Sequence, residues 1–206
     1  HYPHGTALCV DTSTYHDAGA TAVQDLAFAV ATGLEYLRAM EQRGLDVTPA
    51  AGQILFRFSL GTRQFLAIAK LRAARWLWSR VVAACGGDRD AQGMRIHAQV
   101  ARRVLTRRDP YVNLLRNTVA IFAAGLGGAD AITSEPFDVV VGQPGALSRR
   151  IARNTALVLQ EEAHLHHVLD PAGGSWYLDR LTNDLAEEAW AAFQKIERDG
   201  GMLAAI

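Results

Sequence analysis

The stretch from Arg95 to Ala101 contains the two residues best suited to chemistry. Polar and apolar residues alternate along it, a pattern typical of a β-strand with one buried face. The alternation places His97 and Gln99 together on the polar side, which in a barrel could face a ligand in the interior. A neutral imidazole and an amide can both donate to the carbonyl oxygen of a thioester, ketone or carboxylate. A strand histidine satisfied by the barrel interior explains the same pattern, and both interpretations stay open.

A helix is expected directly after this strand. Asp109 is a good N-cap residue, and Pro110 suits the first helical position. Asn113 and Arg116 then lie on the first turns, near the positive end of the helix dipole. They could orient an anionic substrate, although capping and surface charge explain them equally well.

Other polar clusters favour structural explanations. His164 and His167 share a helical face with His166 between them, but metal ligands usually converge from separate elements, so we expect no metal site. Four cations lie on more than one face of a single helix, so we expect them to pair with carboxylates rather than bind nucleic acid. These are Lys70, Arg72, Arg75 and Arg80.

Composition narrows the functional class. Lys plus Arg and Asp plus Glu number 21 each, and no run of like charges occurs, so we expect neither a nucleic-acid nor a membrane-surface partner. No uncharged apolar stretch approaches the roughly 18 residues of a membrane-spanning helix. Cys9 and Cys85 lack metal-ligand spacing and are expected to be reduced thiols of a cytoplasmic protein. The chain begins with His1 rather than Met and looks like a piece of a longer one.

Hydrophobic periodicity predicts five strand–helix repeats. Strands are expected at 6–10, 53–60, 95–101, 129–134 and 167–170. Helices are expected at 18–43, 62–84, after 109, at 147–165, and from a cap at Thr182 to about 198. Short loops between such repeats predict a parallel sheet with right-handed crossovers. The expected fold is therefore a partial α/β barrel of the (β/α)8 type, with about five βα units. An open doubly wound sheet is the alternative, although no GxGxxG follows any strand.

Longer motifs follow one another along the chain. They are Asp17-Ala-Gly-Ala20, Ala69-Lys-Leu-Arg-Ala-Ala-Arg75, Asp109-Pro-Tyr111, Ser148-Arg-Arg-Ile-Ala-Arg-Asn-Thr155, Gln160-Glu-Glu162, Asp170-Pro-Ala-Gly-Gly-Ser175 and Gly200-Gly-Met202. In these motifs and their order the chain resembles the acyl-CoA mutase family, methylmalonyl-CoA mutase in particular. The resemblance implies the C-terminal five units of a (β/α)8 barrel whose axis holds the CoA chain. It also implies adenosylcobalamin docking from a separate flavodoxin-like domain, and carbon-skeleton rearrangement by radicals.

The chain departs from the catalytic members of that family where substrate would bind. They carry His-x-Gln-Thr-Ser-Gly-Trp, whereas this chain follows Gln99 with Val100-Ala-Arg-Arg103. Their Leu-His-Thr-Asn strand is Ile132-Thr-Ser-Glu135 here, their Pro-Arg-Leu-Ser-Phe-Phe is Gly52-Gln-Ile-Leu-Phe-Arg57, and His16 replaces a glutamine. Arg102 and Arg103 in a narrow interior would obstruct a ligand or need carboxylate partners. The Asp-x-His-x-x-Gly cobalamin loop does not occur in this sequence.

This combination resembles the small, non-catalytic subunit of heterodimeric bacterial mutases, including the runs Ala129-Asp-Ala-Ile-Thr133 and Pro136-Phe-Asp138. The resemblance implies that residues 1–206 form one domain, part of a barrel without the cobalamin-binding domain. The chain would bind no cofactor, and a larger catalytic mutase subunit or a missing domain would hold adenosylcobalamin. The alternative is a catalytic acyl-CoA mutase with an altered substrate, using His97 and Gln99 at the thioester. An unrelated aldolase-like barrel would need an inward lysine at a strand end, and no expected strand has one.

Overall fold

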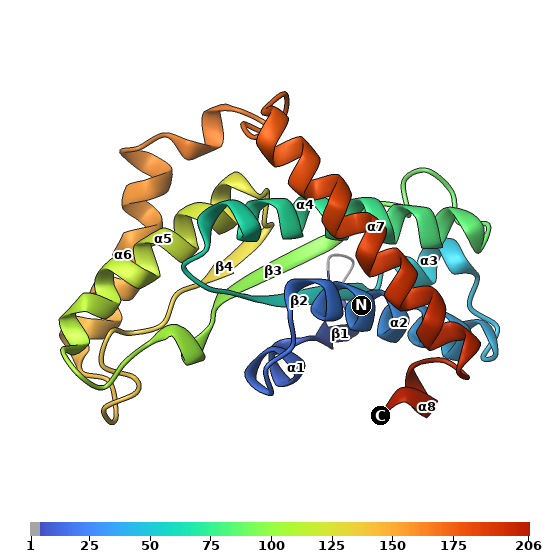
Figure 1. Ribbon diagram of the computed structural model, residues 1–206, viewed down its shortest axis with the longest axis horizontal. Helices are drawn as coiled ribbons and strands as arrows, with labels where there is room; N and C mark the ends of the chain where they lie inside the picture. Colours follow the sequence, from blue (N-terminus) through green and yellow to red (C-terminus); the bar gives the residue numbers. More distant parts are fainter. Residues whose placement is uncertain (1–4) are drawn as a thin grey trace.

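The computed structural model describes residues 5–206, which contain one four-stranded parallel sheet in the order β1-β2-β3-β4 (Figure 1). The strands are β1 (Leu8–Asp11), β2 (Ile54–Leu60), β3 (Arg95–Val100) and β4 (Ala131–Thr133). Neighbours in the sheet are also neighbours in sequence, as right-handed βα repeats require. The arrangement is an α/β fold consistent with part of a (β/α)8 barrel.

Helices connect the strands and extend beyond the last one. The α-helices are α1 (Ser13–Asp17), α2 (Ala22–Glu41), α3 (Val47–Ala51), α4 (Gln64–Ala84), α5 (Asn113–Leu126), α6 (Ala146–Glu161), α7 (Trp176–Arg198) and α8 (Met202–Ala205). Short 3-10 turns are η1 (Arg102–Val104), η2 (Pro110–Val112) and η3 (Leu165–His167). None of the helices among residues 5–206 is long and apolar enough to cross a membrane.

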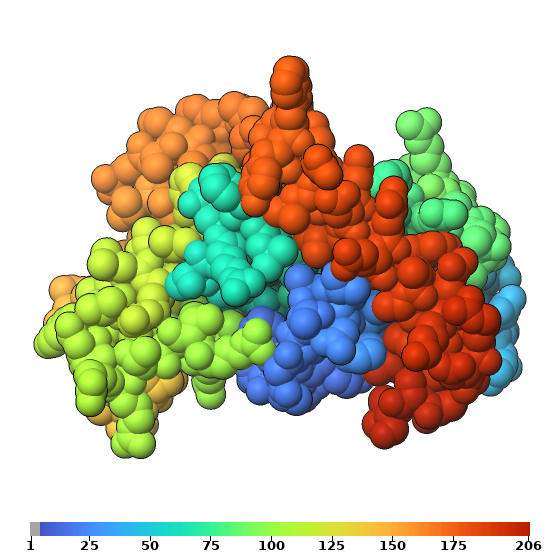
Figure 2. All heavy atoms as spheres, viewed as in Figure 1, coloured from blue at the N-terminus to red at the C-terminus, as the bar shows by residue number. Residues whose placement is uncertain are grey.

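One face of the sheet packs against helices and forms the core. Phe56 and Phe58 of β2 are fully buried there, and the Phe56 ring lies 4.7 Å from that of Trp78 in α4. A Cβ at Gly33 of α2 would come within 2.7 Å of Trp78, so glycine lets α2 approach the sheet closely. Helix α7 crosses α2 and α4 on the outside, and Figure 2 shows the red C-terminal segment beside the blue N-terminal one.

The predicted fifth strand at 167–170 is wrong. His164 takes a left-handed conformation (φ 53°) after α6, and η3 follows, so the chain turns instead of extending. Val168 and Leu169 are 60% and 95% exposed and pair with no strand in the described part of the chain. Two apolar residues next to a turn therefore gave a pattern typical of a short strand. Residues 5–206 contain four strand–helix units rather than five.

Two predicted helix starts are also corrected. Ser175, not Thr182, caps α7: its hydroxyl accepts a hydrogen bond from the Leu178 amide, while Thr182 lies inside the helix. Asp109 has a left-handed conformation (φ 49°) and makes no side-chain cap, so the 3-10 turn η2 precedes α5. In both places a good cap residue occurs in the sequence, but the backbone geometry that capping needs is found elsewhere.

Candidate functional site

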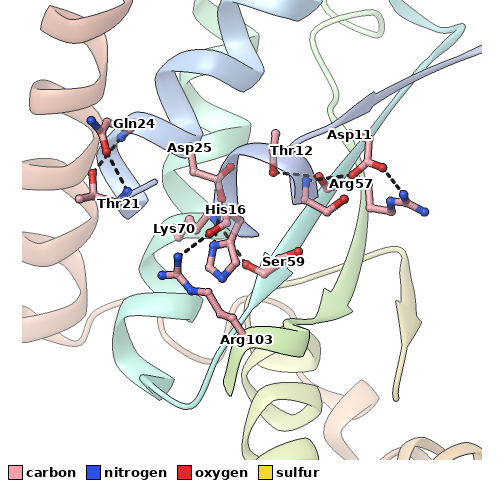
Figure 3. A network of polar contacts seen from close by, with 11 residues as sticks. Asp11, Thr12, His16, Thr21, Gln24, Asp25, Arg57, Ser59, Lys70 and Arg103 are labelled. Carbon is pink, nitrogen blue, oxygen red and sulfur yellow. Dashed lines mark hydrogen bonds and ion pairs between the residues drawn. The ribbon is translucent and has the colours of Figure 1, made fainter. Parts of the chain in front are cut away.

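The second face of the sheet carries a row of polar side chains from neighbouring strands. The parallel register aligns Asp11, Arg57 and His97 across β1, β2 and β3. The Arg57 guanidinium pairs with the Asp11 carboxylate, as Figure 3 shows. His97 and Gln99 are both half-buried on this face, beside each other as the alternation predicted.

His97 is held as a neutral imidazole at neutral pH. Partial burial lowers its pKa below the ordinary 6.5, and the positive charge of Arg57 lowers it further, outweighing the opposite effect of Asp11. Burial alone would raise the pKa of Asp11, but hydrogen bonds from Arg57 and Ser13 hold it below its usual value. This face therefore combines an ionised pair with a neutral hydrogen-bonding ring.

Nε2 of His97 and Nε2 of Gln99 both already have partners within the chain. Nε2 of His97 lies 2.8 Å from the Thr133 hydroxyl. Oε1 of Glu135 accepts from Nε2 of Gln99 at 3.3 Å and from Nε of Arg102 at 3.0 Å. Glu135 is the carboxylate partner that Arg102 required. Glu135 was not predicted as a functional residue, although it lies in the segment Ile132-Thr-Ser-Glu135 that departs from the catalytic family members.

The two weaker candidates lie at the start of α5. Asn113 is fully buried, and its Nδ2 donates to the carbonyl oxygens of Thr106 and Phe137 at 2.9 and 2.8 Å. Its Oδ1 accepts from the Thr106 amide at 3.0 Å and from Arg116 at 2.9 Å. The amide of Asn113 thus ties the segment after β3 to the segment after β4, and it makes no hydrogen bond to His97 or Gln99.

A buried charged cluster lies beneath the start of α2, and of it only the pairing of Lys70 with some carboxylate was predicted from the sequence. The Asp25 side chain is 0% exposed and pairs with Nζ of Lys70, which is 5% exposed and also donates to the Ser59 carbonyl at 3.2 Å. His16 lies beside the pair, with Nδ1 3.9 Å from Oδ2 of Asp25 (Figure 3). The backbone carbonyl of His16 accepts a hydrogen bond from Arg103. Burial lowers the pKa of His16, and the charges of Lys70 and Arg103 lower it further.

The prediction that the α4 cations pair with carboxylates is confirmed for three of them. Lys70 pairs with Asp25, Arg72 binds Asp170 and Asp179, and Arg75 binds Asp130. It is wrong for Arg80, whose guanidinium instead stacks 4.3 Å over the Trp190 ring. The His164, His166 and His167 rings lie 4.4–6.4 Å apart, and residues 5–206 contain no cluster arranged to hold a metal ion.

Comparison with known proteins identifies the family. The family model described as methylmalonyl-CoA mutase matches residues 1–206. This chain belongs to the methylmalonyl-CoA mutase family. The chain is 55% identical over 205 residues to the methylmalonyl-CoA mutase small subunit of Streptomyces virginiae, covering 100% of this chain and 33% of that protein. It is 46% identical to the small subunit of Propionibacterium freudenreichii subsp. shermanii, covering 99% of this chain and 32% of that protein.

The methylmalonyl-CoA mutase of Escherichia coli is 40% identical over 200 residues, covering 96% of this chain and 28% of that protein. The chain therefore spans about a third of the length of the curated mutase relatives it matches. The resemblance drawn from the motifs is confirmed at the level of the family and of similarity to its small subunits.

The lowered pKa values of His16 and His97 predict how stability depends on pH. An unfolded His16 or His97 takes up its proton near pH 6.5, whereas the folded forms do so only at lower pH. Between these pKa values the unfolded state binds more protons, so folding is most stable above about pH 7 and loses stability as the pH falls through 6.5. Urea unfolding between pH 5 and 8 measures this slope. A double His16→Gln, His97→Gln variant should flatten it, and an unchanged slope would refute this assignment.

Proposed function

We propose that this chain is part of the small, non-catalytic subunit of an adenosylcobalamin-dependent methylmalonyl-CoA mutase, which interconverts methylmalonyl-CoA and succinyl-CoA. A larger catalytic subunit would complete the heterodimer in the cytoplasm. Identity supports this choice: it is 46–55% to the small subunits and 40–42% to the relatives named simply methylmalonyl-CoA mutase. The free thiols of Cys9 and Cys85 suit the reducing cytoplasm.

The mutual pairing of the polar groups on the sheet face carries the proposal. A thioester carbonyl needs donors directed toward it, but Nε2 of Gln99 and Nε of Arg102 point to Glu135, and Nε2 of His97 lies against the Thr133 hydroxyl. The Glu135 side chain is only 7% exposed, so separating it from Arg102 would strand a nearly buried charge. That cost opposes any ligand that must break the pair.

The same residues do not fit adenosylcobalamin. A bulky corrin and its nucleoside need an open polar surface, whereas this face presents a charged pair at Asp11–Arg57 and another at Arg102–Glu135. Among these groups, Nε2 of His97 already lies 2.8 Å from the Thr133 hydroxyl, and residues 5–206 contain no cluster arranged to hold a metal ion. We therefore assign the cofactor to the larger subunit or to a domain outside this chain.

Acyl-CoA binding tests the proposal. Calorimetric titration of the full-length protein, separated from any larger partner, with succinyl-CoA should show no saturable binding, because the donors nearest the thioester are directed to Glu135 and Thr133. The competing hypothesis is a catalytic barrel with an altered substrate, in which His97 and Gln99 hold the thioester. Saturable binding that His97→Ala weakens, and that His166→Ala on the exposed turn η3 leaves intact, would favour that hypothesis instead.

A further inference from the structure

A cavity of about 500 Å³ lies beside the buried cluster, at the carboxyl ends of β1 and β2. Residues 19–23 at the start of α2 and residues 59–63 before α4 form much of its wall. His16, Lys70 and Arg103 complete the polar part of the lining, and Figure 3 shows these three side chains grouped together. The cavity lies apart from the hydrogen bonds of His97 and Gln99, so it needs an explanation of its own.

The lining of this cavity is strongly cationic. Arg63, Lys70 and Arg103 line it, and no carboxylate does. Asp25 balances the charge of Lys70 from behind. Arg103 binds only a backbone carbonyl, and Arg63 makes no ion pair within the described residues. Two positive charges therefore remain uncompensated at the cavity wall.

The cavity wall also contains two buried polar groups whose hydrogen bonding is incomplete. The Lys70 ammonium has three N–H groups, of which Asp25 and the Ser59 carbonyl take two. The third makes no conventional hydrogen bond among residues 5–206, although the ammonium also lies 5.1 Å from the centroid of the Phe58 ring and the side chain is only 5% exposed. Nε2 of His16 is likewise buried without a hydrogen-bond partner. A buried ammonium with an unused donor next to a cavity indicates that an acceptor enters from that cavity.

Two long helices begin at the same cavity. Thr21 caps α2 through a reciprocal pair with Gln24, which leaves the amides of Ala22 and Val23 available. Helix α4 starts after Arg63 with no side-chain cap and no acidic residue in its first turn. The exposed amides and the helix dipoles at both starts favour an oxyanion.

We propose that this cavity binds the phosphate group of a small phosphorylated metabolite. Two net positive charges match a phosphate dianion better than a single carboxylate, and the third Lys70 donor supplies a hydrogen bond inside the wall. The volume exceeds that of one phosphate ion, which leaves room for the esterified part of the ligand. This proposal does not rest on the proposed function, because the residues that carry it lie outside the hydrogen bonds of His97, Gln99 and Glu135.

Calorimetry on the full-length protein at fixed ionic strength tests this site, with inorganic phosphate and adenosine monophosphate as probes. Saturable binding of either probe is expected, and tighter binding of the ester would identify an esterified ligand rather than free phosphate. Arg63→Gln should weaken binding about tenfold, the effect of losing one charge-assisted hydrogen bond. Arg89→Gln is the matched control, because Arg89 is an exposed cation in the loop preceding β3, at the other end of the sheet.

Three outcomes would contradict the proposal that this cavity binds phosphate. These are no saturable binding of either probe, equal weakening by Arg63→Gln and Arg89→Gln, or binding that Arg63→Gln leaves unchanged. Arg103→Gln gives a second, independent variant, because Arg103 approaches the cavity from the turn after β3 rather than from α4. It too should weaken phosphate binding.

Discussion

Lys70→Met should destabilise the protein by about 3–5 kcal/mol, since it leaves a fully buried carboxylate without its counter-charge. Asp25 is 0% exposed, and among residues 5–206 Lys70 is its one close cationic partner, with His16 farther away. The loss should be largest above pH 6.5, because His16 is then neutral and cannot replace the lysine. Urea unfolding of the purified protein measures the change in the free energy of unfolding.

The pair can be separated from general packing by a second replacement. The double variant Asp25→Leu, Lys70→Met removes both charges and should recover most of the lost stability. Arg180→Met breaks the exposed pair with Asp184 and should change stability by no more than about 0.5 kcal/mol. A double variant as unstable as Lys70→Met would show that packing of the lysine stem, and not the stranded charge, dominates.

Asn113→Ala should cost about 2–4 kcal/mol, because it removes an amide that serves four partners and leaves backbone groups of two segments unsatisfied. Nδ2 of Asn113 serves the Thr106 and Phe137 carbonyls, and its Oδ1 serves the Thr106 amide and Arg116. Thermal and urea unfolding test this expectation. Asn154→Ala, at an exposed position of α6 with no side-chain hydrogen bond, is the matched control.

This variant also distinguishes two roles for Asn113. A structural role predicts a large loss of stability, whereas a substrate-orienting role predicts unchanged stability and weaker ligand binding. Stability equal to that of Asn154→Ala would rule out the structural role and restore Asn113 as a ligand-binding candidate.

The strand at 95–100 was predictable because its alternation is strict and its buried residues are unambiguous. The same rule failed at 167–170, where Val168 and Leu169 are as apolar as a strand requires but lie exposed beside a turn. Periodicity reports which residues can be buried, and burial itself depends on a neighbouring strand that this segment lacks. Short apolar runs are therefore the weakest part of a prediction from sequence.

Polar partners that come from distant segments were harder to predict. Asp25 and Lys70 are 45 residues apart, and nothing local at either position indicates that α2 and α4 bring them together. Glu135 reaches Gln99 and Arg102 because β4 lies beside β3, which the sequence predicted only as an order of strands. The charge of Arg102 alone predicted that a carboxylate must lie nearby. Knowing which carboxylate it is required the register of the sheet.

Native mass spectrometry of the full-length protein, purified from its own source without denaturation, tests the central claim most directly. The account predicts a heterodimer with a larger sibling subunit, in which the cobalamin mass stays with the sibling when the subunits are separated. A species that carries its own cobalamin and has no larger sibling would contradict it. His97 and Gln99 would then be the first residues to test for mutase activity.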